Sequence, residues 1–296
     1  MARVEKYGKT TVGNLFAHFE RRQKVNKRTG EKEYVKFGNR DIDTRWTPLN
    51  YRVWPPLDED ICDVRELHVA EATRELWERT GQDAEEPALK RYRRIVREVQ
   101  HSNRRDLKTL CDWCISLPDE IPAVRMTEFF DVCLRYCVRE YGAENIAGAW
   151  VHVDEAHRPH LDVAFVPVVD RGTDKERISA KDLLNRKHLK GWHDNLTSVV
   201  KKEMHIDNPG ILNGRTAAQG GNRTVKQMKR SDKAYDRTKG KEVDLWRSAQ
   251  LKKLEKAEKL GKATKLDNLL TDALTRKSEP LKEPRNKTLG EYLRGR

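Results

Sequence analysis

The sequence contains no long apolar run and no apolar segment at its start. None of its 296 residues lies in a stretch of about 18 apolar residues, the length that a helix needs to cross a membrane. The chain begins MARVEKYGKTTVG, with charges where a secretory signal peptide has its apolar core. We therefore expect no membrane insertion and a cytoplasmic location.

Cysteine is scarce, and its five copies make an odd number. In a chain without a secretion signal, this count argues against a disulfide framework. Cys111 and Cys114 have a spacing that zinc sites use, but the segment TLCDWCISLP alternates like a buried strand. Cys133 and Cys137 lie in EFFDVCLRYCVREYG, which has helical spacing. We interpret both pairs as small buried thiols.

Acidic residues are outnumbered, with 47 Asp and Glu against 60 Lys and Arg and a net charge of +13. The excess lies at the ends, because residues 1–54 hold 13 basic and 6 acidic side chains and residues 226–296 hold 21 and 11. Basic ends around a mildly acidic centre favour a polyanion as partner, above all nucleic acid. Solubility alone would explain the same charge, so composition leaves both interpretations open.

The order of the predicted elements indicates an α+β fold. Strands and helices alternate in a way that predicts a mostly antiparallel sheet with helices on one face, and with polar side chains on the other. We expect strands at 3–8, 51–54, 107–117, 149–154 and 160–167, and helices at 63–79, 86–105, 124–142 and from 180 onward.

Composition divides the chain into three parts. Residues 1–209 contain the predicted sheet and its helices. Residues 210–240 are rich in Gly, Asn and Arg and are expected to form a linker. Residues 241–296 place leucines among Lys and Glu, which predicts a basic helical C-terminal region that ends in a disordered tail.

Two runs of β-forming residues flank a cluster of imidazoles and carboxylates in AWVHVDEAHRPHLDVAFVPVV. Because side chains alternate along a strand, His152 and Asp154 share one face of the first run, and His160 and Asp162 share one face of the second. A hairpin that turns about His157 would place His152 opposite Asp162, and Asp154 opposite His160. These four side chains would then lie on one face of the sheet.

The chemistry of this cluster favours a divalent metal ion. Imidazoles mixed with carboxylates suit an ion of the manganese, magnesium or zinc kind, and the absence of thiolate argues against a purely structural zinc site. Glu155, at the start of the connection, is close enough to lean over the same spot. The alternative is a strand pair with a solvated polar face.

Three blocks of sequence resemble a known family. ENIAGAWVHVDEAHRPHLDVAFVPVV followed by RISAKDLLNRKHLKGWHDNL resembles the family's His-x-Asp-Glu-x-x-Pro-His-x-His, Val-Pro, Ser-Ala-Lys and Asn-Arg pattern. HFERR resembles its His-Asn-x-Arg motif, and GNRDIDTRWTPLNYRV its Asn-x-Asp-Ile-Asp…Asn-Tyr motif. The blocks occur in the family's order between residues 14 and 230, and the family is that of the Mob/Pre plasmid mobilisation relaxases of the MobV type.

The resemblance implies an HUH-like relaxase sandwich built on a five-stranded antiparallel sheet. Such enzymes nick and religate one DNA strand at the transfer origin of a plasmid or mobile element, and they form a covalent adduct with the 5′ phosphate. The implied cofactor is Mn²⁺ or Mg²⁺. The implied partners are single-stranded or hairpin transfer-origin DNA and a conjugative coupling protein. The alternatives are an HUH-type replication initiator nickase and a DNA-binding protein with a degenerate metal site.

The first two motifs imply the nucleophile and the DNA contacts. His18 attacks readily as neutral imidazole, whereas Tyr51, with an ordinary pKa of about 10, needs activation; the choice between them stays open. Arg21 is expected to neutralise phosphate charge. The expected DNA-binding residues are Arg22, Arg40, Arg45 and Asn50.

The third motif implies the metal ligands and departs from the family in two places. One residue is inserted between Glu155 and Pro159, and Asp162 stands where the family has its last His. Asp also binds hard divalent ions, so the site is expected to persist, with recruitment of His157 as an alternative. Phe19 replaces the Asn of the first motif. The expected ligands are His152, Glu155, His160 and Asp162.

Overall fold

A computed structural model describes residues 2–30, 32–34, 42–155, 158–211 and 239–259. Several sequence predictions lie outside these residues. They are the contact expected of Arg40, the role considered for His157, most of the linker at 210–240 and the disordered tail after 259. The division of the chain at 209 and 240 therefore stays a prediction.

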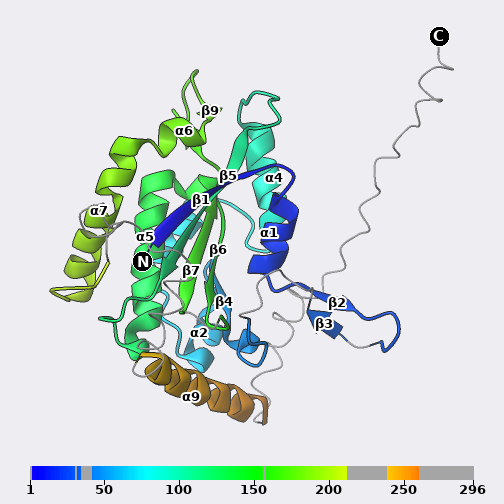
Figure 1. Ribbon diagram of the computed structural model, residues 1–296, viewed down its shortest axis with the longest axis vertical. Coiled ribbons are helices and arrows are strands. Elements are labelled where there is room, and N and C mark those ends of the chain that lie inside the picture. The colour runs from blue at the N-terminus through cyan, green and yellow to red at the C-terminus, as the bar shows by residue number, and fades with distance from the viewer. Residues whose placement is uncertain (1, 31, 35–41, 156–157, 212–238, 260–296) are drawn as a thin grey trace, which may run out of the picture.

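A five-stranded antiparallel sheet forms the centre of the molecule, with strand order β1-β5-β7-β6-β4 (Figure 1). This confirms the predicted α+β class. Its strands are β1 (Ala2–Gly8), β5 (Lys108–Ser116), β7 (His160–Phe165), β6 (Ile146–His152) and β4 (Tyr51–Trp54).

One face of the sheet packs against α5 (Met126–Tyr141) and α7 (Arg186–Met204). The apolar set of each strand points to this side, as period-two alternation requires. Trp113 of β5 stacks on Trp192 of α7 with ring centroids 3.6 Å apart. This face holds the larger hydrophobic core.

The other face is also covered by helices, so the prediction of helices on one face only was wrong. α1 (Val12–Phe19) and α4 (Ala88–Glu98) pack over it. They are needed because this face carries Trp150 and Ala164, which are apolar and must be buried. The polar side chains occupy the remaining end of the same face, beside the last turn of α1.

Two predicted helices are each interrupted. In place of one helix over 63–79, α2 (Glu59–Arg65) ends before Glu66, whose φ is 51°, and α3 (Glu71–Glu78) follows. The break carries Leu67 into the core. The helix expected from 180 begins with the predicted Ser179 cap but stops after one turn, and Asn185 caps the next helix by accepting a hydrogen bond from His188 N.

Short elements complete the described chain. They are β2 (Gln23–Val25), β3 (Lys32–Tyr34), β8 (Val168–Val169), β9 (Arg177–Ile178), α6 (Ala180–Leu183) and the 3-10 helices η1 (Thr47–Leu49), η2 (Ala123–Arg125) and η3 (Ala143–Asn145). All five cysteines are free thiols; Cys111, Cys133 and Cys137 are buried as predicted, whereas Cys114 is partly exposed. Among the described helices, none has the length and apolar character for a membrane span.

The helix α9 (Lys239–Lys259) lies across one end of the sheet domain (Figure 1). It contacts α2, η1 and η2, and it buries Val243, Leu254 and Ala257. The described part of the predicted C-terminal region is therefore helical, and it packs on the sheet domain.

Candidate active site

The hairpin that carries the predicted metal ligands forms, but its register differs from the prediction by two residues. His152 lies opposite His160, and Trp150 lies opposite Asp162. β6 ends at His152 because the chain then leaves β7 and pairs elsewhere: Asp43 N donates to Asp154 O over 2.7 Å, and Glu155 bridges to Ile42. A shift of two residues preserves the faces, so the ligands still converge.

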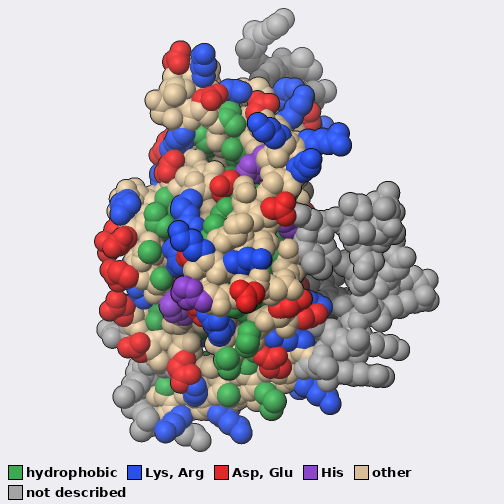
Figure 2. Space-filling model, turned by 90° about the vertical axis from the view of Figure 1, so that its left-hand side faces the viewer, with side chains coloured by type: hydrophobic (Ala, Val, Ile, Leu, Met, Phe, Trp, Pro, Cys, Tyr) green, Lys and Arg blue, Asp and Glu red, His purple; other side chains and the backbone are tan. Residues whose placement is uncertain are grey.

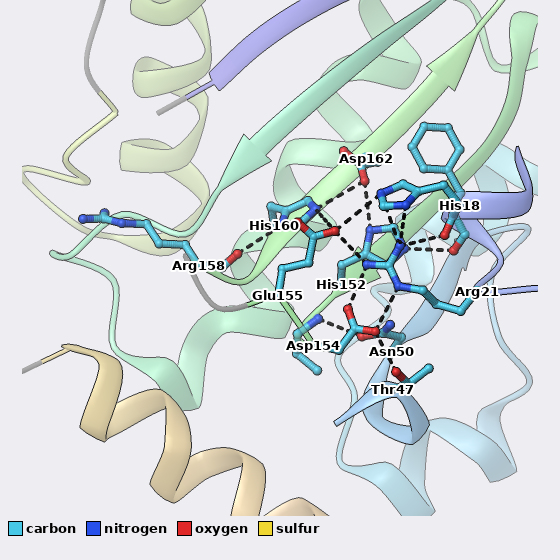
Figure 3. Close-up of polar contacts among 12 residues, drawn as sticks. His18, Arg21, Thr47, Asn50, His152, Asp154, Glu155, Arg158, His160 and Asp162 are labelled. Carbon is cyan, nitrogen blue, oxygen red and sulfur yellow. Dashed lines mark hydrogen bonds and ion pairs between the residues drawn. The ribbon is translucent and has the colours of Figure 1, made fainter. Parts of the chain in front are cut away.

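The ligand atoms of His152, Glu155 and His160 all lie within 4.8 Å of one another (Figure 3). Asp162 joins them, since its Oδ2 is 2.9 Å from His152 Nδ1 and 3.4 Å from His160 Nε2. Cys114, opposite Asp162 on β5, lies within the same limit of His160 and Asp162. Ligands of one ion at roughly 2.1 Å lie about 3 to 4 Å apart, so small movements would let these atoms share a cation.

Backbone carbonyls determine which imidazole nitrogens face the centre of this group. His152 Nε2 is 2.9 Å from Phe19 O, and His160 Nδ1 is 3.0 Å from Arg158 O. A carbonyl only accepts, so both of these nitrogens carry a proton and donate. His152 Nδ1 and His160 Nε2 are thereby directed at the carboxylates. Metal-binding imidazoles are commonly oriented by such a bond from the other nitrogen, and the residues fit a divalent ion.

Electrostatics also suit a cation. Burial would lower the pKa of His160, but the charges of Asp162 and Glu155 outweigh it and raise the pKa to about 9. Burial would raise the pKa of both carboxylates, but it is outweighed by His160 for Asp162 and by the contact with His18 for Glu155. Burial and the neighbouring Arg21 lower the pKa of His152. The group therefore offers two ionised carboxylates and one neutral imidazole, and His160 must release a proton before it can bind an ion.

Arg21 links Asp154, Glu155 and the end of α1 by hydrogen bonds. It is 2% exposed and follows α1 with a left-handed φ of 45°. Its Nε and Nη2 donate to Asp154 over 2.9 and 2.8 Å, Nη2 also donates to Glu155 over 2.8 Å, and Nη1 donates to His18 O over 2.7 Å. Thr47 Oγ1 completes the set with a 2.8 Å bond to Asp154. The predicted contact of Arg21 with phosphate competes with these four bonds.

Asp154 and Thr47 are the residues whose roles sequence reasoning missed. Alternation placed Asp154 with the metal ligands, but its carboxylate is fully buried against Arg21. Nothing in the spacing of Thr47 distinguishes it from other threonines in loops.

His18 lies beside the cluster of His152, Glu155 and His160, whereas Tyr51 lies on the other face of the sheet. The His18 ring is 24% exposed, and its Nε2 lies 3.4 Å from Glu155 Oε1. Tyr51 pairs with Val151, so it points to the opposite face, where it is 4% exposed. Burial raises the pKa of Tyr51 above its ordinary value.

The expected DNA-binding residues are distributed more widely, and the face of the molecule in Figure 2 mixes Lys and Arg with Asp and Glu. Arg22 is partly exposed and pairs with Glu20, and Arg45 is exposed and pairs with Asp43. Asn50 is turned inward, because its Oδ1 accepts a 2.8 Å hydrogen bond from Val153 N. The guanidinium groups of Arg22 and Arg45 therefore remain accessible to solvent. Asn50 instead helps to hold the connection that follows β6 in place.

The chain is similar to proteins of known family. The model of a family described as plasmid recombination enzyme, Mob_Pre, matches residues 90–221. The plasmid recombination enzyme of Streptococcus agalactiae is 26% identical over 238 residues, which cover 78% of this chain and 39% of that protein. The plasmid recombination enzyme type 3 of Staphylococcus aureus is 36% identical over 76 residues, which cover 25% of this chain and 17% of that protein. The chain thus spans less than half the length of these relatives.

Solved structures of the MobM relaxase domain (MOBV; Mob_Pre) have the same fold. The Mn-bound crystal structure at pH 6.8, with plasmid oriT DNA, gives a TM-score of 0.52 at 22% identity and covers 78% of this chain and 97% of that domain. The Mn-bound crystal structure at pH 4.6 gives 0.51 at 22% identity, with 78% and 98% covered. These matches confirm the resemblance to the Mob/Pre relaxases and the predicted relaxase fold.

Proposed function

We propose that the protein is a metal-dependent relaxase that nicks and religates one DNA strand at the transfer origin of a plasmid or mobile element. The observation that carries this proposal is the position of His18, whose ring approaches Glu155 beside His152 and His160. A nucleophile and a cation-binding group on adjoining elements are what phosphodiester transfer requires. The matches to plasmid recombination enzymes support the same chemistry.

The residues that would hold the metal are His152, Glu155, His160 and Asp162. A divalent ion bound there would polarise the scissile phosphate and stabilise the departing oxygen. The family resemblance favours Mn²⁺ or Mg²⁺, and the similar MobM structures are Mn-bound. Cys114 lies at the edge of this set.

His18 is the proposed nucleophile. When His18 Nε2 donates to Glu155, His18 Nδ1 carries the lone pair that would attack phosphorus, and Arg21 Nη1, 3.3 Å from this nitrogen, would have to give it up to the phosphate. A P–N bond forms, the P–O3′ bond breaks, and the 3′ oxygen leaves and takes up a proton. The reverse sequence religates the strand. Arg21, through its bond to His18 O, holds the end of α1 where this attack is possible.

The proposed partner is single-stranded or hairpin transfer-origin DNA, with Arg22 and Arg45 as accessible contacts. A conjugative coupling protein is the second proposed partner. Since plasmid DNA lies in the cytoplasm, we place the protein there.

The decisive experiment is to incubate the protein with Mn²⁺ and labelled single-stranded DNA from the region that flanks its gene. We expect a covalent protein–DNA adduct that forms only with metal. Binding without any adduct would support the alternative of a degenerate metal site. Cleavage at a replication origin in place of a transfer origin would support a replication initiator.

A further inference from the structure

The C-terminal helix α9 reaches the connection that carries the metal ligand Glu155. Arg247 is 8% exposed, and its Nη2 donates to Glu155 O over 3.3 Å (Figure 3 shows α9 below this connection). Its Nη1 donates to Asp244 one turn earlier over 2.7 Å. The guanidinium also lies 5.8 Å from the centre of the Trp46 ring. Arg247 therefore joins α9 to the backbone of a metal ligand.

Other contacts fix α9 against the domain on both sides of Arg247. Before it, Lys239 Nζ donates to Ile121 O, and Glu242 accepts from Ala123 N. After it, Lys253 pairs with Glu66 at the end of α2. A helix anchored at both ends holds its middle side chains in place, so the bond from Arg247 acts from a rigid support.

A second route runs from α9 to the same ligand. Trp46, beneath Arg247, is followed by Thr47, whose hydroxyl donates to Asp154. Asp154 in turn accepts from Arg21, which also donates to Glu155. The connection after β6 is thus held on its carboxylate side by Arg21 and on its backbone side by Arg247.

We propose that Arg247 is a positioning residue for Glu155, so that α9 forms a working part of the metal centre. α9 lies outside residues 90–221, which the Mob_Pre family model matches. The catalytic consequence rests on the proposed relaxase function, whereas the hold on the connection does not. The basic C-terminal region then acts on the metal site in addition to any attraction for DNA.

The test compares Arg247→Ala with Lys253→Ala, which removes another cation of α9 whose ion pair is with Glu66 rather than with the Glu155 connection. In metal-free protein, hydrogen exchange in peptides that contain Asp154 and Glu155 should speed up much more in Arg247→Ala than in Lys253→Ala, which loosens α9 but keeps the contact with Glu155. Mn²⁺ affinity should fall about tenfold, the usual effect of losing a group that orients a metal ligand. On DNA, kcat should fall while KM stays near that of the unaltered protein.

Two further variants keep the proposal testable if Arg247→Ala folds poorly. Arg247→Lys keeps the charge and one donor and should restore part of the Mn²⁺ affinity. Asp244→Asn loosens the guanidinium and should act in the same direction with a smaller effect.

Equal effects of Arg247→Ala and Lys253→Ala on loop exchange and Mn²⁺ affinity would overturn the proposal, because Arg247 would then serve helix packing alone. Unchanged exchange and affinity in Arg247→Ala would overturn it as well. If the unaltered protein neither binds Mn²⁺ nor nicks DNA, the proposed function fails, and the exchange measurement still decides whether Arg247 holds the connection.

Discussion

On the sheet face beneath α1, residues of the same strands are buried in two different ways. Toward α4, Trp150 stacks on Phe19 at 4.9 Å and contacts Phe16, so apolar area removed from water stabilises this end. Toward the end of β6, His152 and Asp162 are as deeply buried, but each is held by hydrogen bonds and opposite charge. One face therefore combines a packed support with a charged site.

The difference shows where stability and function separate. When an apolar side chain is removed from the core, its neighbours can move partly into the space that it leaves. A buried charge that loses its partner has no such relief, because its desolvation is no longer offset by an opposite charge. Changes at the apolar end should alter the free energy of unfolding and leave metal binding intact. Changes at the charged end should affect both.

The largest expected effect is that of replacing His18, the proposed nucleophile, at the boundary between the two ends. His18→Ala should abolish the covalent adduct and lower nicking by roughly 10⁴-fold or more, because it removes the imidazole proposed to form the P–N bond. Origin binding should be nearly unchanged. The adduct and the nicking rate would be measured on labelled single-stranded DNA.

Tyr51→Phe is the matched control for His18→Ala and should nick normally, since Tyr51 is buried on the opposite face. The linkage separates the two residues, because a phosphoramidate is labile in acid and a phosphotyrosyl ester is not. An acid-stable adduct that persists in His18→Ala and disappears in Tyr51→Phe would assign the reaction to Tyr51.

At the charged end, Arg21→Ala should lower the free energy of unfolding by about 3 to 5 kcal/mol, because it leaves the buried Asp154 unpaired. It should also weaken Mn²⁺ binding, since Glu155 loses a donor. Arg22→Ala removes a partly exposed partner of Glu20 and should change either quantity little. Denaturant unfolding would measure the free energy of unfolding, and calorimetry would measure the Mn²⁺ affinity. Equal losses of these two quantities in Arg21→Ala and Arg22→Ala would contradict this account.

At the apolar end, Phe16→Ala should also cost about 3 to 5 kcal/mol of unfolding free energy, through the cavity left among Phe19, Tyr92 and Trp150. The folded protein should still bind Mn²⁺ with unchanged affinity. Loss of affinity at a temperature where the variant is fully folded would show that the two ends are coupled.

The smallest expected effect is the dependence of metal affinity on pH. The pKa of His160, about 9 in the metal-free protein, means that a proton must leave His160 before the ion binds. Mn²⁺ affinity should therefore rise about tenfold per pH unit between about pH 6 and pH 8. Titration calorimetry in matched buffers would detect it, and a flat profile would show that His160 is already neutral.

Alternation along the strands predicted which side chains share a face but not which lie opposite one another. A register shift of two residues leaves the faces unchanged, so His152 paired with His160 and His152 paired with Asp162 are equivalent in sequence. The end of β6 is explained by contacts of Asp154 with Arg21 and Asp43, together with the Glu155–Ile42 bridge. These partners come from distant parts of the chain.

The family motifs placed His18, Glu155 and His160 in one site, and the structure brings them together. The contribution of α9 had no local signal, because Arg247 stands among other cations of a helix that reads as amphipathic and basic. Its role depends on contact with a connection 92 residues away in sequence. Long-range polar contacts of single side chains are the part of such a site that composition and periodicity do not encode.

The end of α1 has one more consequence for how DNA meets the site. The peptide dipoles of a helix leave partial negative charge on its last carbonyls, and Phe19 O points at His152. Together with Glu155 and Asp162, this makes the local potential negative, which favours a cation and repels a phosphate. We expect the ion to bind before the phosphate, because a divalent ion held by these residues would cancel their negative charge and would remove the repulsion that the protein alone exerts on the scissile phosphate.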